Sequence, residues 1–283
     1  MQMQSQGGAV LAIPQALVTQ DAPEASARTK PLVRMQHISK VYSNGTVALR
    51  NLNLDVEQNE FVSLLGPSGC GKSTALRLVA GLGGFTRGAI DWPTSTYDAY
   101  GKPEREVGFV FQEATLMPWA TVFDNVYLPL RLKNMNRKAV TERVKSVLEL
   151  VGLDKFADSY PRELSGGMKM RVSIARALVT QPKLLLMDEP FAALDEITRT
   201  KLSNDLLDIW RKAQCTVMFV THSVFESVYL STRIVVMAAR PGRIVGELPI
   251  DEPYPRDPSF RMTPRYSAHC REVSSLLDKA MNS

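Results

Sequence analysis

The segment GPSGCGKST at 66–74 constrains the fold of this chain more than any other stretch of its sequence. It matches G-x-x-x-x-G-K-[ST], follows the apolar run FVSLL and opens KSTALRLVAGL, which reads as a helix ended by Gly81. An almost unbroken apolar run of this length, here interrupted by Ser63, is typical of a buried parallel strand. The glycines let the intervening loop turn backbone N–H groups toward phosphate oxygens. The sequence therefore predicts a phosphate-binding loop, against the alternative of a plain Gly-rich turn.

Other apolar runs predict an α/β fold around this loop. An inserted helical stretch, about 113–164, interrupts the alternation of strands and helices, so we expect a mainly parallel sheet with a separate helical subdomain. Gly152 is a suitable stop for the helical segment 121–152. Strands are expected at 51–56, 61–65, 107–111, 183–190 and 216–222, and as a pair around a Pro241-Gly242 turn.

Composition limits the class of partner. The 283 residues carry a net charge of +5 that is spread out rather than gathered in runs, which favours a solvated surface over a nucleic-acid patch. The cysteines (Cys70, Cys215 and Cys270) lie far apart in no metal spacing, as in a reducing compartment.

No apolar run reaches the roughly 18 residues that a membrane span needs. The first twenty residues have a short apolar patch without a preceding basic residue, which makes a poor signal peptide. We expect a flexible tail at 1–30, a C-terminal extension at 251–283 that is Pro-rich and then weakly helical, and a cytosolic chain that meets the membrane through a partner.

Two carboxylates follow the apolar run LLLM. Asp188 is placed to hold Mg²⁺ through water, and Glu189 to polarise a water for attack on a γ-phosphate. Lys72 should reach the β- and γ-phosphates, and the Ser73 hydroxyl should bind the same Mg²⁺. The alternative is a pair of solvated acids at a strand end.

A second Gly-rich segment, LSGGMKMR at 164–171, resembles another anion site at a helix start. With LSGGMKMRVSIARAL, the chain from about Leu32 to Leu248 resembles the nucleotide-binding subunit of an ATP-binding cassette (ABC) transporter, with the motifs in the family's order. The resemblance implies an ABC ATPase domain at 31–250 with an antiparallel β edge subdomain, and ATP with Mg²⁺ as ligands. The ATP-binding residues implied in the first loop are Gly66, Pro67, Ser68, Gly69, Cys70, Gly71, Lys72, Ser73 and Thr74.

The resemblance assigns further roles. Tyr42 resembles the aromatic residue that stacks on adenine. Gln112 resembles the glutamine at the junction of core and helical lobe, and this glutamine also serves the metal. His222 resembles the histidine that contacts the γ-phosphate. Asp195, ending AALD, resembles the loop that meets the other subunit. Each residue has a structural alternative. Tyr42 could be an ordinary strand aromatic, Gln112 a loop residue and His222 a strand-end histidine. Asp195 could cap the next helix.

Family members pair head to tail, so the resemblance places Ser165, Gly166 and Gly167 over the γ-phosphate of the partner's ATP. The alternative is that Ser165 only caps its helix. Met168 departs from the family's frequent Gln and cannot donate a hydrogen bond. Cys70, beside Lys72 and a helix start, is expected to be an exposed, reactive thiol.

A single cassette without a membrane segment implies two separate permease subunits and, indirectly, a periplasmic or extracellular solute-binding protein. The segments around Met117-Pro118-Trp119 and Arg240-Pro241-Gly242 resemble the nitrate, sulfonate and taurine importer ATPases. We therefore expect a homodimeric, transport-coupled ATPase at the cytoplasmic face of the cell membrane, taking up a small anion. Trp119 would either dock the permease or lie in the core of the helical lobe.

Two other functions compete with import. A soluble ABC ATPase acting on nucleic acid or ribosomes gains weak support from the pI of about 9.1, but the second cassette, coiled coil or zinc hook of such proteins is not visible. A P-loop small-molecule kinase leaves LSGG, Asp195 and His222 unexplained. We expect no nucleic-acid partner.

Overall fold

The computed structural model describes residues 30–98 and 103–282. The tail expected at 1–30 therefore lies outside the described residues, apart from Lys30. Among the described residues, no helix is long and apolar enough to cross a membrane.

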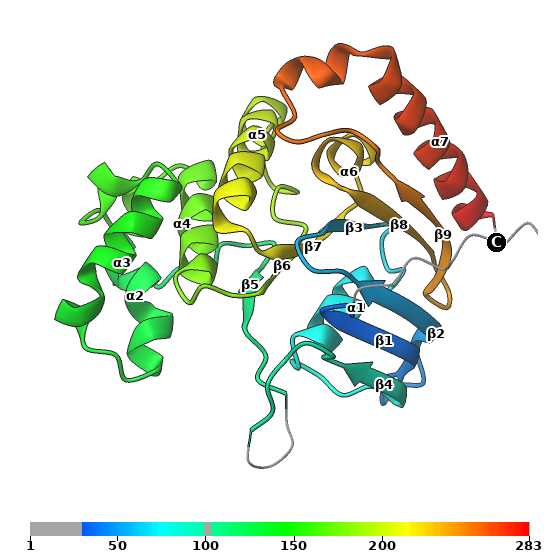
Figure 1. The fold of residues 1–283 in the computed structure, drawn as a ribbon, viewed down its shortest axis with the longest axis horizontal. Coiled ribbons are helices and arrows are strands. Elements are labelled where there is room, and N and C mark those ends of the chain that lie inside the picture. The colour runs from blue at the N-terminus through cyan, green and yellow to red at the C-terminus, as the bar shows by residue number, and fades with distance from the viewer. Residues whose placement is uncertain (1–29, 99–102, 283) are drawn as a thin grey trace, which may run out of the picture.

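A six-stranded sheet forms the centre of the molecule (Figure 1). Its strand order is β5-β6-β7-β3-β8-β9, and all neighbouring strands are parallel except β8 and β9. The strands are β3 (Phe61–Leu65), β5 (Val107–Val110), β6 (Leu184–Asp188), β7 (Thr216–Thr221), β8 (Arg233–Ala238) and β9 (Arg243–Pro249). Every residue of β3, β6 and β7 is buried, which explains why their sequences are almost entirely apolar.

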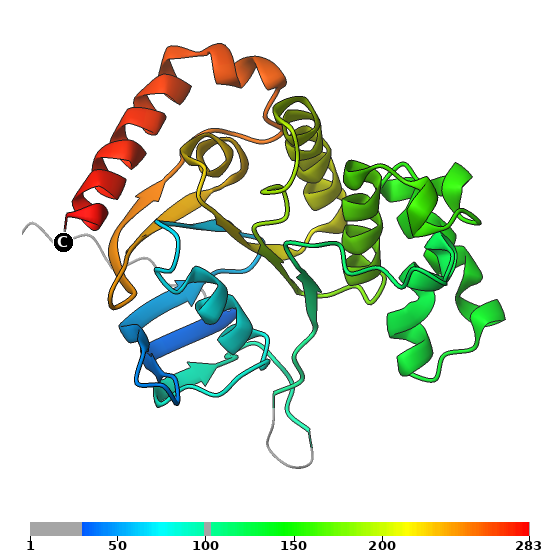
Figure 2. The same cartoon turned by 180° about the vertical axis from the view of Figure 1, so that it is seen from behind.

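A smaller antiparallel sheet, in the order β2-β1-β4, lies beside the phosphate loop (Figure 2). It consists of β1 (Val33–Val41), β2 (Val47–Val56) and β4 (Arg87–Asp91). Its apolar residues join one face of the central sheet, where Val62, Leu186 and Val220 pack with helix α1 (Lys72–Val79). This sheet and the mainly parallel one confirm the predicted fold class.

The opposite face of the central sheet is covered by helices. Alternate strand residues, including Phe61, Leu185 and Phe219, point to this side, because successive side chains of a strand face opposite ways. The helices of this layer are α4 (Gly166–Leu178), α5 (Glu196–Ala213), α6 (Val224–Leu230) and α7 (Pro264–Met281). A buried Phe61–Trp210 edge contact, with ring centroids 5.4 Å apart, joins the sheet to α5.

Helices α2 (Val122–Leu132) and α3 (Arg137–Leu150) form a group with α4 at one side of the molecule (Figure 1). The helical segment predicted at 121–152 is interrupted at 133–136, and Asn136 caps the second helix by accepting a hydrogen bond from the Lys138 backbone N–H. Short 3₁₀ turns at Asp154–Phe156 and Pro161–Glu163 lead to α4. Since the hydrophobic core is continuous from these helices to the sheet, the helical group is braced against the core.

The C-terminal segment is more ordered than its composition indicated. After a 3₁₀ turn at Pro258–Met262, the long helix α7 runs along β8, β9 and α6 and buries Tyr266, Cys270 and Val273. Thr263 caps α7 by accepting a hydrogen bond from the Tyr266 backbone N–H at 3.1 Å. The segment expected to be weakly helical is therefore a packed part of the fold.

Candidate nucleotide-binding site

The predicted phosphate and acidic residues meet at one edge of the central sheet. The loop at 66–71 follows β3, Asp188 ends β6, and His222 follows β7, which lies between the other two strands. Carboxyl ends of parallel strands share an edge, and this edge is where open α/β sheets bind ligands. Residues more than 100 positions apart in the sequence are thereby brought together.

The phosphate loop curls tightly between β3 and α1. The Lys72 ammonium donates to the carbonyl oxygens of Gly66 at 2.7 Å and Pro67 at 3.1 Å, so it lies inside the curve of the loop. Gly71 has φ of 94°, and a Cβ there would lie 2.8 Å from the Ala48 carbonyl oxygen and 2.6 Å from a Leu49 methyl. Only glycine fits this turn, because both the backbone angle and the close approach exclude a side chain.

Ser73 and Asp188 form the part of the site that can hold a cation. Ser73 Oγ donates to Asp188 Oδ1 at 2.6 Å, and Arg77 lies 3.8 Å from the other carboxylate oxygen. Hydroxyl and carboxylate oxygens suit Mg²⁺, and the two are close enough to serve one ion. No cluster of three or more His, Cys, Asp or Glu side chains that could bind a metal occurs in the described ranges.

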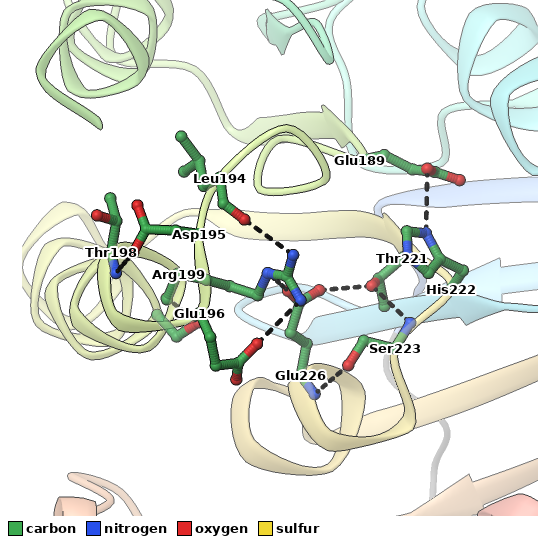
Figure 3. A network of polar contacts seen from close by, with 11 residues as sticks. Glu189, Leu194, Asp195, Glu196, Thr198, Arg199, Thr221, His222, Ser223 and Glu226 are labelled. Atoms are coloured by element: carbon green, nitrogen blue, oxygen red, sulfur yellow. Dashed lines mark hydrogen bonds and ion pairs between the residues drawn. The ribbon is translucent and has the colours of Figure 1, made fainter. Parts of the chain in front are cut away.

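Glu189 lies between the phosphate loop and His222. One carboxylate oxygen is 3.8 Å from Lys72 Nζ, and the other is 3.2 Å from His222 Nδ1 (Figure 3). An ionised carboxylate only accepts, so His222 Nδ1–H is the donor. Glu189 has φ of 46°, in the left-handed region, and its backbone is held by a hydrogen bond to the Val220 carbonyl oxygen. Eight other non-glycine residues of the described ranges also have a positive φ, so this angle orients Glu189 but does not by itself mark a functional site.

Gln112 comes to the same edge from β5. Val110 of β5 pairs with Met187 of β6 in the sheet. Gln112 lies two residues after Val110, and Glu189 lies two residues after Met187, so both follow the same edge of the sheet. Gln112 is exposed, in the segment that leads from the core to α2. No contact of its side chain with Ser73 or Asp188 occurs in the described structure, so its metal role stays a prediction.

Tyr42 lies at the end of the small sheet. Its hydroxyl is 3.2 Å from Thr74 Oγ1 beside the phosphate loop, and Lys40 Nζ lies 5.2 Å from its ring centre. The exposed ring could stack on a planar base, and this role of Tyr42 stays a prediction.

The second Gly-rich segment belongs to α4, in the helical group rather than at the phosphate loop (Figure 1). Ser165 caps α4 by accepting a hydrogen bond from the Met168 backbone N–H at 3.3 Å. Gly166 is exposed, whereas Gly167 is buried, and a Cβ on it would lie 2.9 Å from a Thr198 methyl of α5. The Met168 side chain packs against the core, which gives the departure from Gln a structural reason.

Asp195 caps α5. It accepts a hydrogen bond from the Thr198 backbone N–H at 2.9 Å, and the bonds from Thr198 lower the pKa of its carboxyl. The structural alternative for this residue is therefore observed, and the role at a second subunit stays a prediction.

The expectation for Cys70 was wrong. Its side chain is 0% exposed, and burial raises the pKa of the thiol, an effect larger than the opposing attraction of Lys72. The nearby helix start does not make the thiol reactive, because the side chain packs inward against Gly66. A Cβ built on Gly66 would lie 2.8 Å from Cys70 Sγ. Cys70 thus fills the loop from inside and is not a reactive surface thiol.

Trp119 is 77% exposed, which excludes the core alternative for this residue. It lines a shallow pocket on the helical group together with Tyr127 and Arg131 of α2.

The structure also identifies residues that sequence reasoning missed. Arg176 of α4 donates to the carbonyl oxygens of Ala114 and Thr115, so it fixes the segment just after Gln112. Arg199 of α5 and Glu226 of α6 form a half-buried ion pair beneath His222 (Figure 3). No local motif marks the pairing of Arg199 with Glu226, because the two residues lie 27 positions apart in the sequence.

One edge of the sheet carries the phosphate loop, the acidic end of β6 and the histidine after β7. This arrangement defines a P-loop nucleoside-triphosphatase with inserted helices. The family model of ABC transporters matches residues 49–192. An uncharacterised ABC transporter ATP-binding protein of Methanocaldococcus jannaschii is 48% identical over 233 residues, 81% of this chain and 86% of that protein. The chain therefore belongs to the ABC transporter family, as an ATPase subunit.

Two further comparisons bear on the function and the fold. The aliphatic sulfonates import ATP-binding protein SsuB of Bacillus cereus is 46% identical over 227 residues, 79% of this chain and 88% of that protein. The structure of cbiO1 from Clostridium perfringens, part of the transporter complex cbiONQ, has a TM-score of 0.70 at 25% identity and covers 89% of this chain and 97% of its own. The dimeric ABC transporter cassette MJ0796 has a TM-score of 0.66 at 33% identity and covers 78% of this chain and 99% of its own.

Proposed function

We propose that this chain is the ATP-hydrolysing subunit of an importer for small anions, with aliphatic sulfonates as the first candidates. The position of Glu189, between Lys72 and His222, is the observation that supports ATP hydrolysis by this chain. The similarity to SsuB over most of the chain supports import and the solute class. The alternative of a nucleic-acid ATPase gains nothing from the structure, since its support was net charge alone.

The residues of the site fit hydrolysis of a terminal phosphate. The loop N–H groups and Lys72 would neutralise the phosphates, and Glu189 would orient and polarise the attacking water. His222 holds the Glu189 carboxylate from the other side and would contact the γ-phosphate. Mg²⁺, held by Ser73 and Asp188, would neutralise charge on the phosphate oxygens when bound.

The second Gly-rich segment supports a shared site in a homodimer. In one chain it lies with the helical group, so it would serve an ATP held by another copy. One family relative of known structure, the cassette MJ0796, is dimeric in two structures, and one of these is a post-hydrolysis state bound to ADP and Pi. Ser165 and Gly166 are exposed, as a contact with a partner's phosphate requires.

We further propose that two permease subunits bind the helical group around Trp119, which would keep this chain at the cytoplasmic face of the cell membrane. A solute-binding protein outside the membrane would deliver the solute to the permeases.

Reconstitution tests the proposal. The chain and its candidate permeases would be placed in vesicles with the binding protein, and ATP hydrolysis measured with sulfonates, taurine, nitrate or DNA. Stimulation by a binding protein loaded with a sulfonate is the expected result. Stimulation by DNA without permeases would favour the alternative function.

A further inference from the structure

A polar network connects the loop at Asp195 with the residues that flank His222 (Figure 3). Arg199 of α5 stands at its centre. Its guanidinium donates to the Leu194 carbonyl oxygen at 3.0 Å, and its Nε lies 3.5 Å from Glu226 Oε1 of α6. The contact with Glu226 is an ion pair without a hydrogen bond, so the planar guanidinium donates to the Leu194 carbonyl and holds the Glu226 carboxylate by charge.

Glu226 extends the network to both sides of His222. Thr221 Oγ1 donates to Glu226 Oε2 at 2.5 Å and accepts from the Ser223 backbone N–H at 3.0 Å. Ser223 Oγ in turn accepts from the Glu226 backbone N–H at 3.3 Å. The residues before and after His222 are thus bonded to one carboxylate or to each other.

Burial makes this network stiff. The side chains of Glu226 and Arg199 are 11% and 25% exposed, and burial raises the pKa of Glu226 against the effects of Thr221 and Arg199. A charge at this depth needs its partner, since an unpaired buried ion is costly. Movement of one partner is therefore expected to move the other.

We propose that Arg199 and Glu226 are positioning residues that couple the Asp195 loop to His222. The proposal rests on the proposed function, in which this loop meets a second copy and His222 serves the γ-phosphate. When the second copy presses on the Asp195 loop, Arg199 moves with the Leu194 carbonyl and pulls Glu226, which resets the His222 loop against Glu189. ATP hydrolysis would thereby depend on contact between the two copies.

A simple brace is the competing explanation for the same contacts, and an NMR signal of His222 separates the two. The chain has three histidines, so the ring C–H signals can be assigned with His222→Gln. Four full-length chains would be compared: wild type, Asp195→Ala, Arg199→Lys and the double variant. Asp195→Ala removes the α5 cap next to Leu194. Arg199→Lys keeps the charge that Glu226 needs but loses the fork.

We expect Asp195→Ala to shift the His222 signal in the wild-type background and not in Arg199→Lys. We also expect Arg199→Lys to lower kcat about tenfold with the KM for ATP within about twofold of wild type, because the phosphate loop is untouched. Asp205→Asn is the matched control, since it breaks another Arg–carboxylate pair of α5, with Arg171, and should alter neither readout.

An Asp195→Ala shift that is absent, or equal in both backgrounds, would overturn the proposal. The equal shift would mean that the signal travels along the backbone from Asp195 to Glu189 instead. If Arg199→Lys does not fold, Glu226→Gln replaces it as the background and is judged in the same way. The NMR experiment does not require turnover, so absence of ATP hydrolysis in the wild type would refute the proposed function and leave the coupling still measurable.

Discussion

At the scale of single residues, Glu189 is the residue to which we assign activation of the attacking water. Its backbone has φ of 46°, so the carboxylate leaves the sheet edge at an angle that a regular strand end would not give. The side chain then reaches between Lys72, the first residue of α1, and His222, which follows β7. In this position the carboxylate has a donor on either side, the Lys72 ammonium and the His222 ring.

Glu189→Gln should abolish most ATP hydrolysis. The amide retains the shape but cannot accept a proton, so kcat should fall on the order of 100-fold or more, while ATP binding persists. Turnover and equilibrium ATP binding are the measurements. Glu142→Gln, an exposed change on α3, should leave both unchanged. Near-normal turnover of Glu189→Gln would remove Glu189 from the catalytic role.

At the scale of elements, the termini of α6 are fixed by distant segments. Its start is bonded through Glu226 to Arg199, as described above. Its end is capped by Arg256 of the C-terminal segment, which donates to the carbonyl oxygens of Val228 at 3.0 Å and Tyr229 at 2.8 Å. Because α6 follows His222 directly, the C-terminal segment helps to hold the candidate site although it lies far from the phosphate loop.

The helical group presents a different kind of surface. Trp119→Ala should weaken assembly with the permeases by about 2 kcal/mol, because exposed tryptophans at interfaces carry much of the binding energy. The unfolding temperature and ATP affinity of the isolated chain should stay unchanged, since Trp119 is 77% exposed. Co-purification with the permeases and thermal unfolding are the measurements.

Leu132→Ala is the matched control for this surface. Leu132 also lies exposed on α2 but does not line the pocket beside Trp119, so its removal should leave assembly intact. Normal permease binding by Trp119→Ala would place the docking surface elsewhere on the molecule.

At the scale of the whole molecule, one chain carries two candidate anion sites that do not meet. The phosphate loop leads into α1, beside the small sheet, whereas Ser165 and Gly166 open α4 in the helical group (Figure 2). A head-to-tail dimer would join the two kinds of site across its interface, and each ATP would then touch both copies.

Mixing two inactive variants tests this arrangement. Lys72→Ala breaks the phosphate loop, and Gly166→Asp places a carboxylate where the partner's γ-phosphate is expected. Gly166 is exposed, and its Cβ would stand 3.5 Å from a Leu194 methyl, so the aspartate fits; at Gly167 it would collide with α5. Each homodimer should be inactive, and random mixing should recover roughly a quarter of wild-type activity, because half the dimers hold one sound site.

Single-turnover cleavage of bound ATP is the measurement for the mixture, since steady turnover would also require cooperation of both sites. Gly166→Ala, which adds no charge, is the control and should stay active. If a verified mixed dimer cleaves no ATP, the site is not shared between the copies.

Much of the fold and site could be predicted because the signals are local. The loop at 66–74 carries its own strand, turn and helix start, and the apolar runs at 184–188 and 216–221 mark strands buried on both faces. The environment of Cys70 could not be predicted, because a thiol beside a lysine and a helix start can point outward or inward. Only the packing of the loop against its neighbours excludes it from water.

The sequence by itself determined the buried strands at 61–65, 184–188 and 216–221, the phosphate loop after the first of them, and the two carboxylates at 188 and 189, since each depends on neighbours within a few positions. The tertiary structure decided which distant residues share the sheet edge, that Gly167 approaches α5, and that Arg199 pairs with Glu226. The physical reason is burial: a charge or thiol removed from water is defined by whatever packs around it, and those neighbours come from other parts of the chain.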